Sequence, residues 1–447
     1  MDQETTVLEK MTQHLLNKDY LTFKPYIHVL KQLYFKEKEN QKQKQIIQLN
    51  NIHNTIKNMV SDQTLNNGLF DSGPQNEIKI VKMNQQIESH ESLSIKEAEK
   101  LVSEGVALYN LNEYQEAIEF YNRAISISPK YYAAWQNKGL ALCNLNIYYE
   151  AIECYEKAIS INPISDVVWN NKGNALDDLN KYEEAIECYD KAISINPKYD
   201  IAWYNNGLAL RKLNKYEEAI ECYDKAISVN PKDAAAWCNK GFVLNNIKKY
   251  EEAIECYDKA ISINPKYDAA WYNKGLTLRK LNKYEEAIEC YDYANSINPK
   301  YDAAWYNKGF VLNNIKKYQE AIECYERAIS INPKYDAAWC NKGYALYNLN
   351  KYEEAIECYD KAISINPKFD ASWSNKGFTL HKLKQHKDAI MCYDQALSIS
   401  ITPLRLLLKA DSLFELGNKQ EAKQYYFDAL QKGSNQKDYI KKQLSKL

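Results

Sequence analysis

Eight tryptophans, all those in the chain, stand 34 residues apart, and this period constrains the fold more than any other feature. The first is Trp135 and the last is Trp373, and each is followed four residues later by a glycine. A fixed period of this length indicates a stack of identical supersecondary units, each burying its apolar face against its neighbours. The functional question is therefore what such a stack binds.

One unit, residues 166–199, shows the expected local structure. Apolar residues follow helical spacing on both sides of Asn180, which predicts two helices joined by a short turn. The second helix is expected to end before Pro197, because the residue before a proline avoids the α region. Gly173 is small enough to let the two helices cross closely beside the large ring of Tyr189.

This unit resembles the tetratricopeptide repeat (TPR) family. The resemblance rests on the 34-residue period, the Trp and Gly of the first helix, and a run that reads Ala151, Tyr155, Ala158 and Pro163 in the second. One departure is a leucine, such as Leu142, where the family often has an aromatic residue. The resemblance implies an all-α fold, a right-handed superhelical α-solenoid whose first helices line a concave groove.

Counting outward from the tryptophans gives ten units, with degenerate units at both ends, as a terminal repeat that faces water requires. Ser94 and Glu97 form a capping box that is expected to start the first repeat helix. Ser434 or Asn435 is expected to cap a final short helix. We expect four regions: an N-terminal helical region at 1–60, a flexible linker at 61–93, the ten-repeat solenoid at 94–436 and a capping helix at 437–447.

Residues 26–60 contain an interrupted apolar seam of about two heptads. Self-association through this segment is one interpretation, and a helix that packs on the solenoid or stays free is the other. The formal net charge of −1 gives no global field that favours nucleic acid. No apolar run approaches the roughly 18 residues of a membrane span, and no signal peptide begins the chain. We expect a cytoplasmic protein, with the nucleus and the cilium left open.

The eleven cysteines indicate packing and not chemistry. Eight recur at one repeat position, from Cys154 to Cys392, where stacked helices place equivalent atoms about 10 Å apart, too far for a disulfide. Zinc-ligand spacing, a Gly-rich phosphate loop and a nucleophile elbow are all missing from the sequence. We therefore predict no catalytic residue, no metal, no cofactor and no small-molecule substrate.

An asparagine follows each Trp by two positions, on the helix expected to line the groove. An amide both donates and accepts, so a ladder of them can hold the backbone of an extended peptide whatever its side chains. The ladder resembles that of the TPR domain of O-linked N-acetylglucosamine transferase. The alternative is that the amides bond only within the repeat or to water. The ladder consists of Asn137, Asn171, Asn205, Asn239, Asn273, Asn307, Asn341 and Asn375.

Aromatic and basic residues vary beside the ladder, as expected of a binding surface. The aromatic candidates are Tyr204, Tyr272, Tyr306, Phe242, Phe310 and Phe378. The basic candidates are Arg211, Lys212, Arg279 and Lys280. The two basic pairs are 68 residues apart, which indicates a duplicated pair of units and two similar subsites. An acidic or phosphorylated extended segment of a protein is the expected partner.

The sequence thus predicts a non-catalytic scaffold that binds extended peptide segments in a concave groove. Three alternatives stay open. The first is a substrate-recognition arm associated with a glycosyltransferase. The second is a subunit of a larger assembly, for example a ciliary or cell-cycle complex. The third, disfavoured by the charge balance, is a helical-repeat RNA-binding protein.

Overall fold

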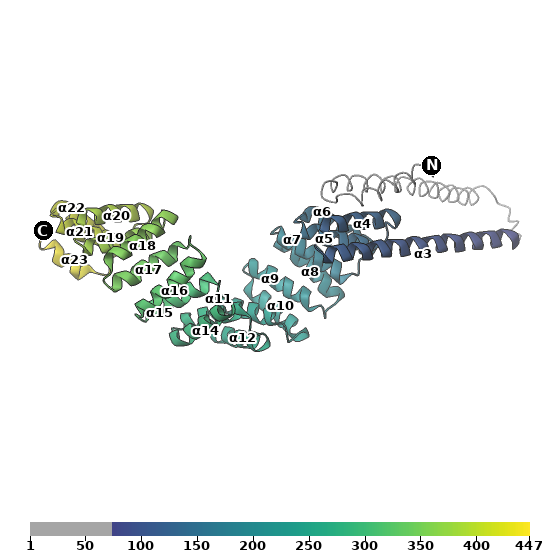
Figure 1. The fold of residues 1–447 in the computed structure, drawn as a ribbon, viewed down its shortest axis with the longest axis horizontal. Helices are drawn as coiled ribbons and strands as arrows, with labels where there is room; N and C mark the ends of the chain where they lie inside the picture. Colours follow the sequence, from purple (N-terminus) through teal and green to yellow (C-terminus); the bar gives the residue numbers. More distant parts are fainter. Residues whose placement is uncertain (1–73) are drawn as a thin grey trace, which may run out of the picture. The chain divides into compact units, whose positions relative to one another are not determined.

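The computed structural model describes residues 74–447, and the chain divides into two units at Ser92 and Leu93. The regions predicted at 1–60 and 61–73, with the seam at 26–60, lie outside the described residues. Helix α3 (Pro74–Asn110) runs through the position of the expected capping box, so the described part of the expected linker is helical (Figure 1). Pro74 opens this helix, where its missing N–H leaves no hydrogen bond unmade.

Beyond α3, helices alternate in antiparallel pairs. The odd-numbered helices are the first of each pair: α5 (Tyr132–Asn144), α7 (Asp166–Asp178), α9 (Asp200–Lys212), α11 (Ala234–Asn246), α13 (Asp268–Lys280), α15 (Asp302–Asn314), α17 (Asp336–Asn348), α19 (Asp370–Lys382) and α21 (Pro403–Glu415). The even-numbered helices are the second: α4 (Tyr114–Ile127), α6 (Tyr148–Ile161), α8 (Tyr182–Ile195), α10 (Tyr216–Val229), α12 (Tyr250–Ile263), α14 (Tyr284–Ile297), α16 (Tyr318–Ile331), α18 (Tyr352–Ile365), α20 (His386–Ile399) and α22 (Lys419–Gln431). With the end of α3 pairing α4, residues 93–447 hold the ten predicted units.

The turn inside each unit depends on one residue in the left-handed region. Asn180 has a φ of 59°, and asparagine occupies the same place in most units, because its short polar side chain tolerates this conformation. Three units use Lys248, Lys316 or Lys384 there. The break expected at Asn180 is therefore confirmed.

The core of each unit is a tyrosine of the even helix packed against the glycine of the odd helix. Tyr189 is 2% exposed, and a Cβ added to Gly173 would lie 2.5 Å from its Cε1. No side chain larger than hydrogen fits there without moving the ring. The close crossing predicted at Gly173 is therefore confirmed.

The tryptophans are half-buried and pack against the core of their units. In all eight units the indole Nε1 donates to the carbonyl oxygen of the proline six residues earlier, at 3.0–3.2 Å. This bond joins the turn between units to the next odd helix. The turn needs an N–H donor, which explains a Trp in place of a Phe.

Helix α23 (Lys437–Leu444) covers the last unit. Ile440 is fully buried and Leu444 is partly buried against the core of α21 and α22. The predicted helix is confirmed, but its N-cap residue is Gln436. The backbone N–H of Gln436 donates a hydrogen bond to the hydroxyl oxygen of Ser434 at 3.2 Å. Ser434 thus supports the turn before the helix and does not cap it.

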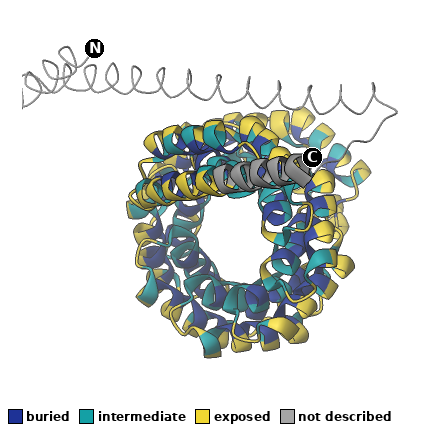
Figure 2. Cartoon of the chain, turned by 90° about the vertical axis from the view of Figure 1, so that its right-hand side faces the viewer, coloured by how far each residue is buried: buried dark blue, intermediate teal, exposed yellow. Residues whose placement is uncertain are grey.

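Contacts between units set the curvature of residues 93–447. Consecutive odd-numbered helices from α5 to α21 approach one another directly, whereas consecutive even-numbered helices do not approach to the same degree. A stack that is tighter on its odd side bends toward that side, so the odd helices line the concave side. Figure 2 shows the helices winding around a central opening, with exposed residues gathered at the outer margin. Within the described residues, no helix is long and apolar enough to span a bilayer.

Candidate functional site

The inner face is made by five positions on each odd helix, those one, two, five, eight and nine residues after the Trp position. These are the positions that contact the neighbouring odd helices. For example, the residue two after Trp237 contacts the residue one after Trp203, and the residue eight after Trp203 contacts the residue five after Trp237. The predicted ladder, aromatic and basic residues all fall on these positions.

The ladder amides are half-buried, and Asn307 is buried, so they are less exposed than the sequence suggested. The preceding unit covers them. In three units the amide donates from Nδ2 to a tyrosine hydroxyl 35 residues earlier, at 2.8–3.2 Å: Asn239 to Tyr204, Asn307 to Tyr272 and Asn341 to Tyr306. In three other units the ladder amide donates to a different residue 35 positions earlier. Asn205 donates to Asn170 Oδ1, Asn273 to Cys238 Sγ and Asn375 to Cys340 Sγ.

Backbone carbonyls fix the direction of some ladder amides. Asn239 and Asn307 also donate from Nδ2 to the carbonyl oxygens of Ala235 and Ala303, at 3.0 and 2.8 Å. A carbonyl only accepts, so the amide nitrogen must face its own helix and the Oδ1 atom must face away. Among the described residues no donor reaches these two Oδ1 atoms, and neither is sealed from solvent. At these two positions the ladder therefore presents hydrogen-bond acceptors.

Arg211 and Arg279 lie near the ends of α9 and α13, each over a phenylalanine of the next odd helix. The guanidinium carbon of Arg211 is 5.1 Å from the ring centre of Phe242, and that of Arg279 is 5.0 Å from Phe310. Cation–π contact holds a guanidinium in place but leaves its charge uncompensated. Within the described part of the chain, neither arginine forms an ion pair with a carboxylate, unlike the neighbouring Lys212.

A buried tyrosine of the even helix lies beside each arginine. The hydroxyls of Tyr223 and Tyr291 are buried, and the guanidinium of Arg211 lies within hydrogen-bonding reach of the Tyr223 hydroxyl. The equivalent hydroxyls are also buried in units without this arginine, so their burial is a feature of the repeat: Tyr121, Tyr257, Tyr325 and Tyr393. Burial raises the pKa of the Tyr223 and Tyr291 hydroxyls, and the positive charge of the nearby arginine partly opposes this rise. Buried polar atoms without partners are uncommon in folded proteins.

The structure therefore assembles two equivalent clusters whose members are 68 residues apart. The first cluster is Tyr204, Arg211, Tyr223, Asn239 and Phe242. The second cluster is Tyr272, Arg279, Tyr291, Asn307 and Phe310. Each contains one arginine without a carboxylate partner, one phenylalanine ring beneath that arginine and one ladder amide.

The two lysines predicted beside the arginines reach back to the preceding unit. Lys212 forms an ion pair with Asp177 at 2.5 Å, whereas Lys280 donates to the neutral Asn245 Oδ1 at 3.1 Å. Burial and then the charge of Arg279 lower the pKa of Lys280. The first cluster thus has a neutralised lysine at its side, and the second has a lysine without a counter-charge.

The family profile described as Tetratricopeptide repeat matches most of the stack, and a second profile with the same description matches residues 358–391. The first profile matches residues 98–131, 132–164, 167–199, 201–233, 234–267, 269–301, 303–335 and 337–369. This chain belongs to the tetratricopeptide repeat family. No curated protein matches its sequence.

Several solved structures share the TPR helix pairs. A crystal structure of MamA is 26% identical and covers 36% of this chain and 95% of its own, with a TM-score of 0.35. A structure of YrrB, described as a TPR protein with an unusual peptide-binding site, is 24% identical over 42% and 96%, with a TM-score of 0.37. The Cut9–Hcn1 hetero-tetramer of APC/C is 14% identical over 79% and 84%, with a TM-score of 0.44.

The outer side of the TPR units also carries cations, but these are paired. Six lysines, each three residues after a Trp, form an ion pair with an acidic residue 16 positions earlier. The acidic residue lies on the even helix of the preceding unit. The pairs are Lys172–Glu156, Lys240–Asp224, Lys274–Asp258, Lys308–Asp292, Lys342–Glu326 and Lys376–Asp360. In unit 7, for example, Lys308 also lies 5.9 Å from the ring of Trp305. These ion pairs connect neighbouring units and have a structural role.

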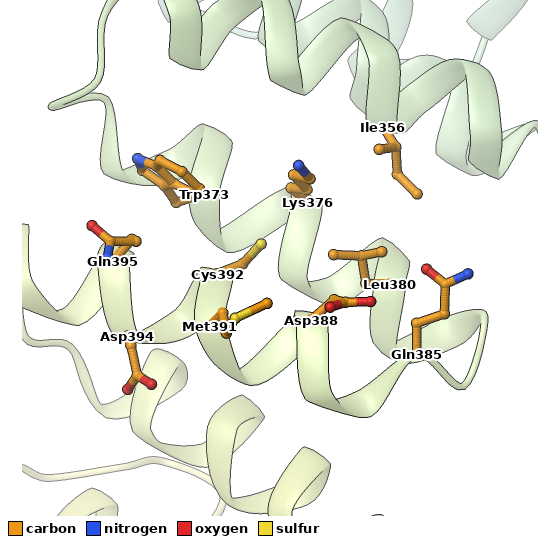
Figure 3. Close-up of a pocket in the computed structure, with 10 residues that line it drawn as sticks. All are labelled: Ile356, Trp373, Lys376, Leu380, Gln385, Asp388, Met391, Cys392, Asp394 and Gln395. Atoms are coloured by element: carbon orange, nitrogen blue, oxygen red, sulfur yellow. The ribbon is translucent and has the colours of Figure 1, made fainter.

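An outer hollow lies beside one of these lysines, between α18, α19 and α20. Trp373, Lys376 and Leu380 line one wall, and Figure 3 shows Met391 and Cys392 on the other. A second hollow has the equivalent lining two units earlier, with Trp305 and Lys308 at the same places. A hollow that recurs with the repeat is a consequence of TPR packing, so it does not define a unique site.

The cysteines of the repeats are free, and all of them are buried except the half-buried Cys143. Burial raises the pKa of Cys290 to about 12, so this thiol stays protonated and unreactive at neutral pH. Among the described residues, no three His, Cys, Asp or Glu side chains gather where they could hold a metal ion.

The sequence did not reveal the contacts of the arginines with Phe242 and Phe310, or the part played by Tyr223 and Tyr291. The contacts of the arginines with the phenylalanines join residues 31 positions apart in different units, so they depend on how units stack. The shared 68-residue offset is the one signal that could have grouped these residues. Phe378, also predicted for the site, has the same place on the inner face as Phe242, but its neighbour there is Tyr347 and not an arginine, at 5.3 Å between ring centres.

Proposed function

We propose that this TPR chain is a non-catalytic scaffold whose inner face binds an extended segment of a partner protein. The observation that carries the proposal is the ladder. The amide nitrogens of Asn239 and Asn307 are committed to their own helix and the preceding unit, while Oδ1 stays without a donor. An extended peptide has unpaired backbone N–H groups, which are the donors that such oxygens need.

The aromatic row supports the same function. Tyr344 and Phe378 are 43% and 39% exposed on the inner face, and Phe242 and Phe310 are half-buried. Exposed aromatic side chains next to fixed polar groups provide apolar contact for the side chains of a bound segment. Backbone recognition by the amides combined with aromatic contact fits a ligand read mainly through its extended conformation.

The test is a selection of random 14-residue peptides by display on the full chain. A ladder variant with Asn205, Asn239, Asn273 and Asn307 changed to Ala is the comparison. Selected peptides should bind the variant more weakly by about 2 kcal/mol or more, since each lost hydrogen bond contributes about 0.5–1.5 kcal/mol.

The matched control changes four exposed outer residues, Glu221, Glu255, Glu289 and Glu323, to Ala. This variant should bind like the parent chain, and both variants should keep the helical circular dichroism of the parent. Peptides that bind the ladder variant and the parent equally well would assign the amides to structure alone and remove the basis of the proposal.

A further inference from the structure

We propose that the bound segment carries two acidic side chains about six residues apart, one for the first cluster and one for the second. This inference rests on the proposed function and names the chemistry of the partner. Its basis is the repetition of the same unsatisfied cationic site two units along the inner face.

Each cluster lacks the anion that its groups require. Arg211 and Arg279 have no carboxylate partner among the described residues, whereas the outer lysines Lys240 and Lys274 each form an ion pair with an aspartate. A carboxylate offers two acceptor oxygens, and a guanidinium is suited to bind them together. An acidic side chain would satisfy donors that the protein leaves unsatisfied.

The separation of the clusters sets the spacing of the acidic residues. Neighbouring helices pack about 8–10 Å apart, so two units correspond to roughly 20 Å. An extended chain advances about 3.3 Å per residue, which gives about six residues between the two anchors. An even number also places both side chains on the same side of the extended chain. A spacing of five would point the second side chain away from the inner face.

The two clusters differ in charge. Lys212 beside the first cluster is neutralised by Asp177, whereas Lys280 beside the second donates to the neutral Asn245. The second cluster therefore has two cations without a carboxylate, Arg279 and Lys280. A phosphoryl group carries more negative charge than a carboxylate and more acceptor oxygens. We expect the second cluster to gain more than the first when its acidic anchor is replaced by phosphoserine.

Nucleic acid also presents regularly spaced anions, but the ladder disfavours it. The open Oδ1 atoms of Asn239 and Asn307 are acceptors, and a phosphodiester backbone supplies no donors to them. A peptide supplies both the anions and the backbone N–H groups. The formal net charge of −1 also gives no long-range attraction for a polyanion.

The experiment measures fluorescence anisotropy of labelled 14-residue peptides with the full chain. The peptides share a neutral Ser, Thr and Val background and carry two glutamates spaced by six, two spaced by five, or two glutamines spaced by six. Further peptides replace one glutamate by phosphoserine. The six-spaced glutamate peptide should bind about tenfold more tightly than the five-spaced one, which keeps one anchor, and about a hundredfold more tightly than the glutamine peptide, which keeps neither. Both preferences should weaken as salt is added.

Two protein variants locate the effect. Arg211→Met and Arg279→Met should each remove about tenfold of the affinity for the six-spaced peptide and leave the glutamine peptide unchanged. Arg211→Lys and Arg279→Lys keep the charge and should retain most of the binding, which separates a loss of charge from a loss of folding. Asp177→Asn frees Lys212 and should raise the affinity of the six-spaced peptide a few-fold.

Equal binding of the glutamate and glutamine peptides would overturn the two-anion inference. If that shared binding is also lost in the ladder variant, the peptide scaffold remains and only the acidic spacing is wrong. Tighter binding of a labelled single-stranded oligonucleotide than of any peptide would overturn both the inference and the proposed function.

Discussion

The outer and inner faces of the repeats use the same kind of residue in opposite ways. On the outside, six of the seven lysines that follow a Trp by three positions meet an acidic side chain of the preceding unit and are 18–20% exposed. On the inside, Arg211 and Arg279 lie over rings and meet no carboxylate among the described residues. Cations paired within the chain hold units together, whereas cations left unpaired are available to another molecule.

The largest expected effect comes from a substitution in the core, which tests whether the outer and inner faces depend on the same buried residues. Tyr291 is fully buried between α13 and α14, so Tyr291→Ala should cost about 3–5 kcal/mol. Because repeats contact only their neighbours, the loss should be concentrated in α12 to α16. Hydrogen exchange read by mass spectrometry should show faster exchange there on both faces. Faster exchange throughout residues 93–447 would mean that the stack unfolds as one block.

A second prediction isolates the tyrosine hydroxyls that reach the inner face. The hydroxyl of Tyr189 donates to Asn174 Oδ1 at 2.9 Å, whereas that of Tyr291 has no partner. Tyr189→Phe should lower stability by about 0.5–1.5 kcal/mol, and Tyr291→Phe should be neutral or stabilising. Urea denaturation of the two variants provides the measurement. A similar loss in both would show that Tyr291 has a partner after all, and the second cluster would lose one of its unsatisfied groups.

The third prediction compares the cations of the two faces directly. Lys308→Met removes the ion pair with Asp292 and the contact with Trp305, so it should destabilise by up to about 1 kcal/mol. Arg279→Met loses no ion pair and only the contact with Phe310, so it should destabilise by about 0.5 kcal/mol or less. Thermal unfolding at low and high salt distinguishes them, since only the Lys308 effect should shrink with salt. A larger loss from Arg279→Met would make that arginine a structural residue.

The smallest effect concerns His381. It has the same repeat position as Arg211, five units earlier, and Arg279, three units earlier. Burial, followed by His386, lowers the pKa of His381, and its Nδ1 lies 2.8 Å from Ser412 Oγ. The unfolded chain therefore binds more protons than the folded one just below the ordinary histidine pKa of about 6.5, so stability falls as the pH falls through this range. The loss is complete once the pH is below the folded pKa.

His381→Gln is the control, because it removes the titrating group. The difference in Tm between this variant and the parent should be constant above pH 7 and should change in favour of the variant between pH 6.5 and 5. A difference that does not depend on pH would show that His381 titrates alike in the folded and unfolded chains.

The sequence carried most of the fold, because the features of one unit are local. The helix pair, the turn at Asn180 and the glycine at the crossing each depend on residues a few positions apart, and repetition removes ambiguity. The burial of the ladder could not be read in this way, since Tyr204 covers Asn239 from 35 residues away. The ion pair of Lys212 could not be predicted for the same reason, because its partner Asp177 belongs to another unit.

The 68-residue offset between the two clusters has a consequence for how such a chain can change in length. The contacts that make a cluster lie within one unit or between it and the next, so an added 68-residue pair would bring a complete third cluster in the same register. An added 34-residue unit would instead place unlike neighbours side by side and break one cluster. The number of anchor points is therefore a modular property, and valency can be altered in whole steps without designing any new interface.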